Sequence, residues 1–187
     1  MGKAANSSIS LKQIHVTDNF WNKYVHLVKD VIIPYQWDIL NDKLEDVETS
    51  HCIENFKIAA GEKEGEFQGA VFQDTDVAKW LEAVGFVLNY ERDEKLEELA
   101  DETIELIGRA QQPDGYLNTY FTIKEPDGRW SNLMEGHELY TAGHMIEAAV
   151  AYYEATGKRR FLEIVSKFAD LVCQTFGPEE GKIHGYP

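Results

Sequence analysis

Four helical segments of two alternating kinds constrain the fold of this 187-residue chain more than any other feature. Residues 77–90 and 138–154 are apolar nearly all round, which predicts helices that are buried on most sides. Residues 94–111 and 160–176 each carry one apolar stripe on an otherwise polar helix, which predicts helices that cover a core. The predicted order along the chain is therefore inner, outer, inner, outer.

The two pairs of helices repeat at an interval of roughly 63 to 66 residues, which is too long for tetratricopeptide-type repeats. Each pair ends in a turn-rich segment, at 112–116 and at 177–181. The Pro-Asp-Gly sequence within the first of these segments is explained by turn formation alone. Stacked helical hairpins of this kind predict an all-α fold, the (α/α)6 six-hairpin toroid. At this spacing the chain holds about three hairpins, roughly the first half of a ring.

The N-terminal region precedes these pairs. Residues 1–8 are interpreted as a tail, and the partial alternation of residues 9–16 predicts one short N-terminal β-strand. We therefore divide the chain into a tail with a strand at 1–15 and an incomplete barrel portion at 16–187. Asp18 or Asn19 is expected to cap the next helix, and Pro34 is expected to interrupt it. A short helix is predicted at residues 53–60.

Composition and charge exclude several classes of function. The net charge of −15 argues against a nucleic-acid partner, because an acidic surface repels phosphate. No apolar run is long enough to span a membrane, and no secretory signal is recognised at the N-terminus, so we expect a cytoplasmic protein. The two cysteines, Cys52 and Cys173, make neither a disulfide framework nor a zinc pattern. We expect both to be small, buried, reduced side chains.

Candidate site residues lie just before each inner helix, because the loops at one end of the inner helices form the bowl of a toroid. Asp74 and Asp76 precede the first inner helix and suit either the binding of sugar hydroxyls or acid–base chemistry. The alternative is that Thr75 or Asp76 merely caps the helix. The residues leave both interpretations open.

Two histidines mark the second inner helix. His137 falls in the first turn, at the mouth of the bowl, and is the better site candidate. His144 lies two turns further on, about 10.5 Å along the axis, which is too far for the pair to hold one zinc ion. We therefore expect His144 to be a core histidine with its hydrogen bonds satisfied, and no metal site in this chain.

Several motifs, taken together and in order, resemble the N-terminal part of glycoside hydrolase family 127, the β-L-arabinofuranosidases. The resemblance runs from about Val16 to the last residue, and the combination of motifs is specific to that family. The segments that carry it are 31–37, 72–77 with Lys79 and Trp80, 109–117, 137–140 with Gly143 and His144, and 177–185.

The resemblance implies an (α/α)6 barrel followed by β-sandwich domains, and retaining cleavage of terminal L-arabinofuranose. It implies a zinc-bound cysteine nucleophile, a glutamate acid/base, and a zinc site of three cysteines and one glutamate. In that family these residues lie in the later half of the barrel. Cys52 and Cys173 match neither motif, so we expect no catalytic residue and no zinc in this chain, and zinc only in the full-length enzyme.

The resemblance does carry sugar-binding residues onto this chain. His137 lies in the matching His-Glu-Leu-Tyr motif, and His184 lies in the matching Lys-Ile-His-Gly stretch. Gln73, Asp74 and Asp76 lie in the matching Phe-Gln-Asp segment. The implied partner is an L-arabinofuranosyl oligosaccharide. We expect the chain alone to hydrolyse nothing, and its bare half-ring to self-associate.

Two other functions remain as alternatives. One is another enzyme on the same toroid, such as an unsaturated glucuronyl hydrolase, in which Asp74 or Asp76 would be the inverting catalytic residue. Zinc bound to the complete protein would separate it from the first interpretation. The other is a non-catalytic helical module that binds carbohydrate or protein, which a stable, catalytically silent product with saccharide affinity would support.

Overall fold

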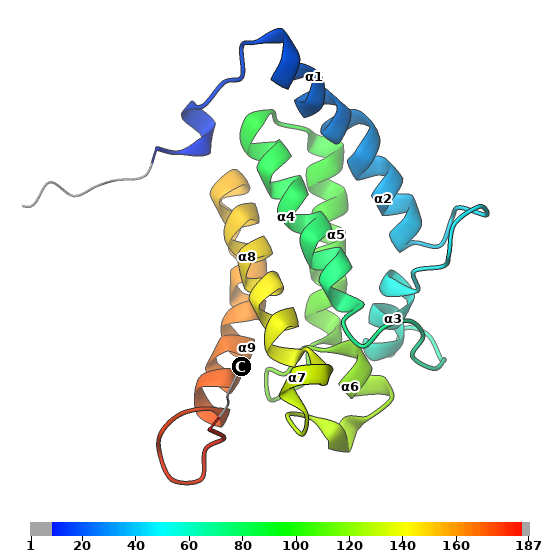
Figure 1. The fold of residues 1–187 in the computed structure, drawn as a ribbon, viewed down its shortest axis with the longest axis vertical. Helices are drawn as coiled ribbons and strands as arrows, with labels where there is room; N and C mark the ends of the chain where they lie inside the picture. The colour runs from blue at the N-terminus through cyan, green and yellow to red at the C-terminus, as the bar shows by residue number, and fades with distance from the viewer. Residues whose placement is uncertain (1–8, 185–187) are drawn as a thin grey trace, which may run out of the picture.

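The computed structural model describes residues 9–184, so the expected tail at 1–8 lies outside the described residues. Two helical hairpins form its centre: α4 (Asp74–Tyr90) with α5 (Glu94–Ala110), and α8 (Glu138–Thr156) with α9 (Arg160–Thr175). Figure 1 shows α4 and α8 side by side and running in the same direction, with α5 and α9 returning behind them. The four helices predicted from the sequence are confirmed, with ends shifted by no more than three residues.

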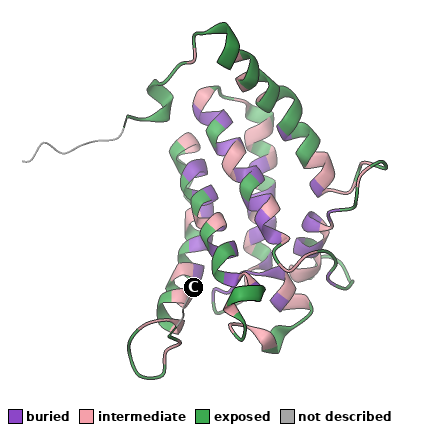
Figure 2. Ribbon diagram, in the orientation of Figure 1, coloured by how far each residue is buried: buried purple, intermediate pink, exposed green. Residues whose placement is uncertain are grey.

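Burial separates the inner helices from the outer ones (Figure 2). In α4, 11 of 17 residues are buried, against 6 of 17 in α5. In α8, 8 of 19 residues are buried, against 4 of 16 in α9. The alternation of inner and outer helices is therefore confirmed, and with it the all-α class.

The two inner helices approach each other most closely at Gly85. A Cβ atom built there would lie 2.8 Å from the carbonyl carbon of Ala151 and 3.0 Å from the backbone nitrogen of Tyr152. Real Cβ atoms do not approach backbone atoms so closely, so only glycine fits without moving α8. Backbone contact thus fixes the pairing of α4 and α8 at the end away from the candidate bowl.

The predicted N-terminal strand is wrong. Residues Leu11–Gln13 form a 3-10 turn, η1, in which the backbone N–H of Ile14 donates to the carbonyl oxygen of Leu11 at 3.0 Å. Ile9 and Ile14 are largely exposed, and no neighbouring strand is available within residues 9–184 to accept ladder hydrogen bonds. The proposed domain boundary after residue 15 stays a prediction.

A long helical run follows, made of α1 (Asn19–Leu27), a π-helical turn η2 (Val28–Ile32) and α2 (Ile33–Leu40). The Asp18 carboxylate accepts from the backbone N–H groups of Phe20 and Trp21, which confirms the predicted cap. Pro34 does not interrupt the run, contrary to expectation. The wider π turn just before it accommodates a residue that has no N–H to donate.

The long run is fixed to α4 by its second half. The Trp80 indole N–H donates to the carbonyl oxygen of Ile33 at 3.1 Å, and the Trp37 and Trp80 rings lie 4.5 Å apart. A loop then leads to α3 (Cys52–Ala59), the short helix predicted at 53–60. Trp80 is 2% exposed, so this contact belongs to the core.

A crossover segment of residues 112–137 connects the first hairpin to the second. It contains α6 (Thr119–Ile123), the 3-10 turn η3 (Pro126–Gly128) and α7 (Leu133–Gly136). In Figure 1 these short helices gather around the N-terminal ends of α4 and α8. Across residues 9–184, none of the helices has the length and apolar character that crossing a bilayer requires.

Candidate functional site

The N-terminal ends of both inner helices are each held by a buried carboxylate. Asp74 is the first residue of α4 and is 1% exposed; its two oxygens accept from the backbone N–H and the hydroxyl of Thr119. Glu138 is the first residue of α8 and is fully buried; it accepts from the Tyr116 hydroxyl and from the Trp130 backbone N–H. All the donors come from the crossover segment, so both inner helices start from one shared support.

These carboxylates respond differently to their surroundings. Burial raises the pKa of Asp74 to about 6, although the two hydrogen bonds from Thr119 oppose the shift and the nearby Asp76 adds to it. Burial also raises the pKa of Glu138, but its two hydrogen bonds and the Arg129 guanidinium oppose the rise. Arg129 stacks on the Tyr116 ring, 3.9 Å from its centre, and pairs with Asp114 at 3.0 Å. A cation therefore accompanies Glu138, whereas no cation contributes to the pKa shift of Asp74.

Gln73 and Asp76 form a polar pair at the start of α4. The Gln73 side-chain amide donates to the Asp76 carboxylate at 2.8 Å and to the Ser50 hydroxyl at 3.3 Å. The alternative in which Thr75 or Asp76 caps the helix is wrong. Gln73 is the N-cap residue, and the backbone N–H groups of Thr75 and Asp76 already bond to carbonyl oxygens of the turn before the helix. The Asp76 side chain is thus free of the capping role, and it lies half-buried.

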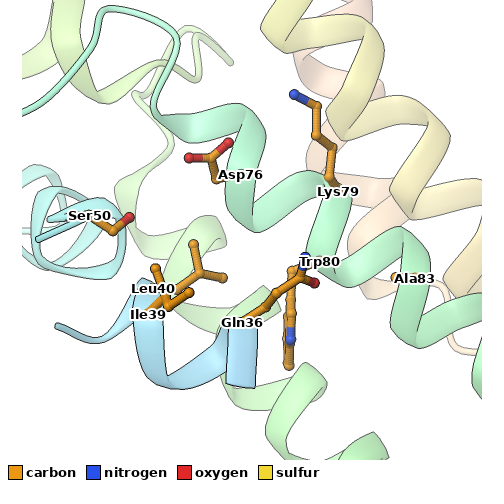
Figure 3. Close-up of a pocket in the computed structure, with 8 residues that line it drawn as sticks. All are labelled: Gln36, Ile39, Leu40, Ser50, Asp76, Lys79, Trp80 and Ala83. Atoms are coloured by element: carbon orange, nitrogen blue, oxygen red, sulfur yellow. The ribbon is translucent and has the colours of Figure 1, made fainter. Parts of the chain in front are cut away.

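A cavity of about 370 Å³ adjoins this pair, between α2 and α4 (Figure 3). Asp76, Lys79 and Trp80 line it from α4, and Gln36 lines it from α2. In Figure 3 the Lys79 side chain points toward α8, away from Asp76, and its ammonium group lies 5.5 Å from the centre of the Tyr140 ring. The cavity therefore presents an amide and a carboxylate beside an indole, the mixture that suits a polar ligand with apolar faces. Its remaining lining residues are Ile39, Leu40, Ser50 and Ala83.

His137 lies between α7 and α8, where its left-handed backbone (φ 53°) turns the chain into the inner helix. Its ring is half-exposed and lies 5.2 Å from the Phe72 ring, measured between centres. The Nδ1 atom is 2.8 Å from the carbonyl oxygen of Glu135, so Nδ1 carries the proton and donates it. In the neutral ring Nε2 is then a hydrogen-bond acceptor at the surface. Phe72 brings His137 near the start of α4, beside Gln73.

The other two histidines differ from each other in position. His184 is exposed in the loop that follows α9, and that loop lies at the same end of the molecule as the N-termini of α4 and α8 (Figure 1). The expectation that His144 is a satisfied core histidine is wrong: its side chain is 21% exposed, and Nδ1 is buried without a hydrogen-bond partner. The sugar-binding roles of His137, His184 and Gln73 stay predictions.

The cysteines do not fit a zinc–thiolate centre. Cys52 is fully buried and its thiol donates to the carbonyl oxygen of Gln73 at 3.4 Å. Burial, with a contribution from the charge of Asp74, raises the pKa of the Cys52 thiol well above its usual range, which disfavours the thiolate that a metal needs. Cys173 is exposed on α9, so the expectation that both cysteines are buried is wrong for this one. No step of the chemistry is assigned to either thiol.

Sequence reasoning missed the residues that support the site. Tyr116 and Glu138 lie in motifs that the sequence singles out, whereas Thr119 lies in none, and the contacts of Tyr116 with Glu138 and of Thr119 with Asp74 were not predicted. One signal was available: each inner helix begins with an acidic residue, and a negative charge at that position is stabilised by the positive end of the helix dipole. The identity of the partners depends on how the crossover segment folds, which no local pattern encodes.

Comparison with known proteins places the chain in a family. The model of the β-L-arabinofuranosidase catalytic domain of glycoside hydrolase family 127 matches residues 13–187. A non-reducing end β-L-arabinofuranosidase of Bifidobacterium longum subsp. longum is 44% identical over 188 residues, which cover 92% of this chain and 29% of that protein. The chain thus spans less than a third of the curated relative that it matches.

Solved structures agree with the sequence match. The crystal structure of a family 127 β-L-arabinofuranosidase from Geobacillus stearothermophilus T6 superposes with a TM-score of 0.92 at 63% identity, covering 93% of this chain and 27% of that one. A second family 127 β-arabinofuranosidase gives a TM-score of 0.86 at 35% identity, covering 96% of this chain and 28% of that one. The fold, the order of motifs and these matches agree, and the chain belongs to glycoside hydrolase family 127, the β-L-arabinofuranosidases.

Proposed function

We propose that the native gene product, the whole protein as its source makes it, is a retaining β-L-arabinofuranosidase that acts on terminal residues of arabino-oligosaccharides. This chain would form one wall of its sugar site, at the N-terminal ends of α4 and α8. The observation that carries the proposal is the gathering of Gln73, Asp76 and His137 at these two helix starts, in a chain of this family. Relatives that match the chain are named as enzymes of this activity.

Each residue has a definite part in holding the sugar. His137 would accept a sugar hydroxyl at Nε2, because its Nδ1 proton is already used by the Glu135 carbonyl oxygen. The half-buried Asp76 carboxylate would accept a second hydroxyl, and the Gln73 amide would keep that carboxylate oriented. Asp74 lies beneath the surface, so we assign it the support of the crossover segment through Thr119.

The bond-breaking groups are proposed to lie outside residues 1–187. Retaining hydrolysis needs a nucleophile and an acid/base about 5 to 5.5 Å apart, on either side of the scissile bond. Asp74 has both oxygens engaged by Thr119, and Cys52 is held as a buried thiol. The residues of this chain would therefore bind and orient the sugar, while zinc and the nucleophile are expected elsewhere in the full-length enzyme.

The test is kinetic and uses the native gene product with a nitrophenyl β-L-arabinofuranoside. His137→Ala removes one hydrogen bond to the sugar and should lower kcat/KM about 10- to 100-fold. The matched control is His26→Ala, which removes an exposed histidine of α1 paired only with Asp30. Unchanged kinetics in His137→Ala, or equal losses in both variants, would refute the assignment.

The same assay separates the rival enzyme. If Asp76 binds sugar, Asp76→Asn should raise KM more than it lowers kcat. Turnover of an unsaturated glucuronide that Asp76→Asn abolishes would instead favour a glucuronyl hydrolase with a catalytic aspartate. The first anomer released, followed by proton NMR, reports whether configuration is retained.

Several finer expectations stay predictions. They are the cytoplasmic location, the L-arabinofuranosyl oligosaccharide as the substrate, zinc in the full-length enzyme, and self-association of the half-ring. Large apolar side chains do lie exposed on the inner helices, among them Phe86 at 48% and Val150 at 43%. Sedimentation of the isolated 187-residue chain over a range of concentrations would test self-association directly.

A further inference from the structure

One face of the inner helix pair carries a ladder of side-chain contacts that starts at His137. The Phe72 and His137 rings form its first contact, and the Lys79 ammonium over the Tyr140 ring forms the second. The Tyr140 ring then meets the His144 ring edge to face, with centres 4.5 Å apart. Because the two helices are parallel, each contact along the ladder lies deeper than the one before it, measured from the helix N-termini.

The next contact along this ladder is of a different kind. Glu82 of α4 and His144 and Glu147 of α8 bring one ligand atom each to within 4.8 Å of one another. His144 Nδ1 lies 3.6 Å from the Glu147 carboxylate, and Nδ1 is buried without a hydrogen-bond partner. Within residues 9–184, neither carboxylate forms an ion pair with a lysine or an arginine. Two negative charges and an unused imidazole nitrogen thus face one point.

We propose that Glu82, His144 and Glu147 form a binding site for a divalent transition-metal cation of the zinc class, which joins α4 to α8. No sugar-binding residue proposed above belongs to it, because His137 lies two helical turns, about 10.5 Å, nearer to the helix start. The donor set contains no sulfur, so this site is also separate from the zinc–cysteine centre that the family resemblance implies. The inference does not depend on the proposed function.

The donor chemistry selects the class of metal. One imidazole and two carboxylates match the nitrogen and oxygen ligands that Zn²⁺ accepts, whereas Ca²⁺ requires six to eight oxygen ligands. Zn²⁺ holds such ligands at about 2.0 to 2.2 Å, so the three donors must draw closer together than they are now. Glu147 can move, because its side chain is 65% exposed, while the Tyr140 ring limits the movement of His144. Three protein ligands leave a coordination position for water.

The test counts metal ions in the native gene product. Protein stripped with a chelator is dialysed against Zn²⁺, and bound metal is measured by elemental analysis. The wild type should bind one equivalent more than His144→Asn, and Zn²⁺ should raise the Tm of the wild type by more than it raises that of the variant. His51→Asn is the matched control, because His51 also lies beside a carboxylate, that of Asp42, but outside the triad. It should bind as much metal as the wild type.

Cobalt identifies the ligands without reference to activity. The Co²⁺ spectrum of the wild type minus that of His144→Asn should contain visible d–d bands and no thiolate-to-cobalt charge-transfer band. If His144→Asn does not fold, Glu147→Gln replaces it, since that exposed side chain bears little on folding; it should weaken the extra equivalent at least 10-fold. Equal stoichiometry and equal affinity in the wild type and the folded variants would overturn the proposal, as would a difference spectrum that contains the thiolate band. Kinetics of His137→Ala bear only on the sugar site, so the two proposals fail separately.

Discussion

The starts of α4 and α8 solve the same structural problem in two ways. Each helix begins with a buried carboxylate, Asp74 or Glu138, and each carboxylate accepts two hydrogen bonds from the crossover segment. Glu138 has in addition the Arg129 guanidinium, stacked on the Tyr116 ring. Asp74 has instead a second acid nearby, Asp76. The same position in the repeat is thus electrostatically compensated at one helix and uncompensated at the other.

The comparison distinguishes the hydrogen bonds that hold each carboxylate in place from the cost of burying its negative charge. Hydrogen bonds alone hold Asp74 in place. They do not offset the cost of burying its charge, so its pKa rises to about 6. At Glu138 the nearby cation reduces that cost. We therefore expect removal of the negative charge to favour the protein at Asp74, and removal of the carboxylate to be most harmful at Glu138.

The largest effect is expected from Glu138→Ala. The substitution leaves the Tyr116 hydroxyl and the Trp130 N–H buried without an acceptor, and it removes a carboxylate that the Arg129 charge stabilises. Loss of one partner from a buried charged network costs about 3 to 5 kcal/mol of unfolding free energy. Urea unfolding of the native gene product measures it. Glu135→Ala, at an exposed position three residues earlier, should cost less than about 0.5 kcal/mol. A loss at Glu138 as small as that of the control would remove the asymmetry.

Asp74→Asn should have an effect that depends on pH. The folded-state pKa of Asp74 is raised, so its contribution to stability is favourable below about pH 4 and is lost as the pH rises through about 6. Asparagine has no such titration, and its amide can still accept from the Thr119 N–H while donating to the hydroxyl. Relative to the wild type, the variant should gain on the order of 3 kcal/mol between pH 4 and pH 7. The exposed Asp46→Asn should give a flat difference. A flat difference for Asp74→Asn as well would contradict the uncompensated-charge account.

Tyr116→Phe tests the hydrogen-bonding half of the comparison. It removes the hydroxyl that donates to Glu138 and leaves the ring, with Arg129 on its face, in place. We expect a loss of about 1 to 3 kcal/mol, because one oxygen of a buried carboxylate loses its donor. Tyr120→Phe removes a hydroxyl from an exposed pair with Glu125 and should cost clearly less. Equal losses would mean that the Tyr116 hydroxyl is not a support of α8. Differential thermal unfolding is sufficient for this measurement.

The smallest effect is expected from Arg129→Gln. This substitution would leave Glu138, like Asp74, as a buried carboxylate whose pKa no nearby cation lowers. Loss of the stacked cation should cost about 1 kcal/mol near neutral pH. It should also raise the pKa of Glu138 further, so that the loss of stability as the pH rises above the usual range of a glutamate becomes larger than in the wild type. Arg92→Gln, at a side chain that is 74% exposed, is the control. A variant whose pH profile parallels that of the wild type would show that Arg129 does not compensate Glu138.

The fold was largely predictable because apolar periodicity reports burial directly. The all-round apolar α4 and the striped α5 differ in the sequence as they differ in the structure, and Asp18 caps α1 as its residue type suggests. The prediction of a strand at 9–16 was wrong because alternation indicates a strand only where a partner supplies ladder hydrogen bonds. The prediction of a helix break at Pro34 was wrong because the π-helical turn before it accommodates a residue without an N–H.

The candidate site was predictable only at the level of position. Placement before an inner helix identified Asp74, Asp76 and His137, and the family motifs pointed to the same residues and added Gln73. Their environments depend on segments distant in sequence: Thr119 buries Asp74 from 45 positions away, and Glu82 meets His144 across two helices. Local pattern carries no information about such partners, which is why neither the ladder of side-chain contacts that starts at His137 nor the triad of Glu82, His144 and Glu147 was predicted.

The parallel pairing of α4 with α8 also has a consequence for synthesis on the ribosome. The chain must be extended from Tyr90 to Thr156 before the whole of the partner helix exists, and at about 5 to 20 residues per second this takes roughly 3 to 13 s. During that interval the surface around Gly85, which packs against the backbone of α8 in the folded protein, lacks that partner. The nascent α4–α5 hairpin therefore exposes, for that interval, the face of α4 that α8 later covers.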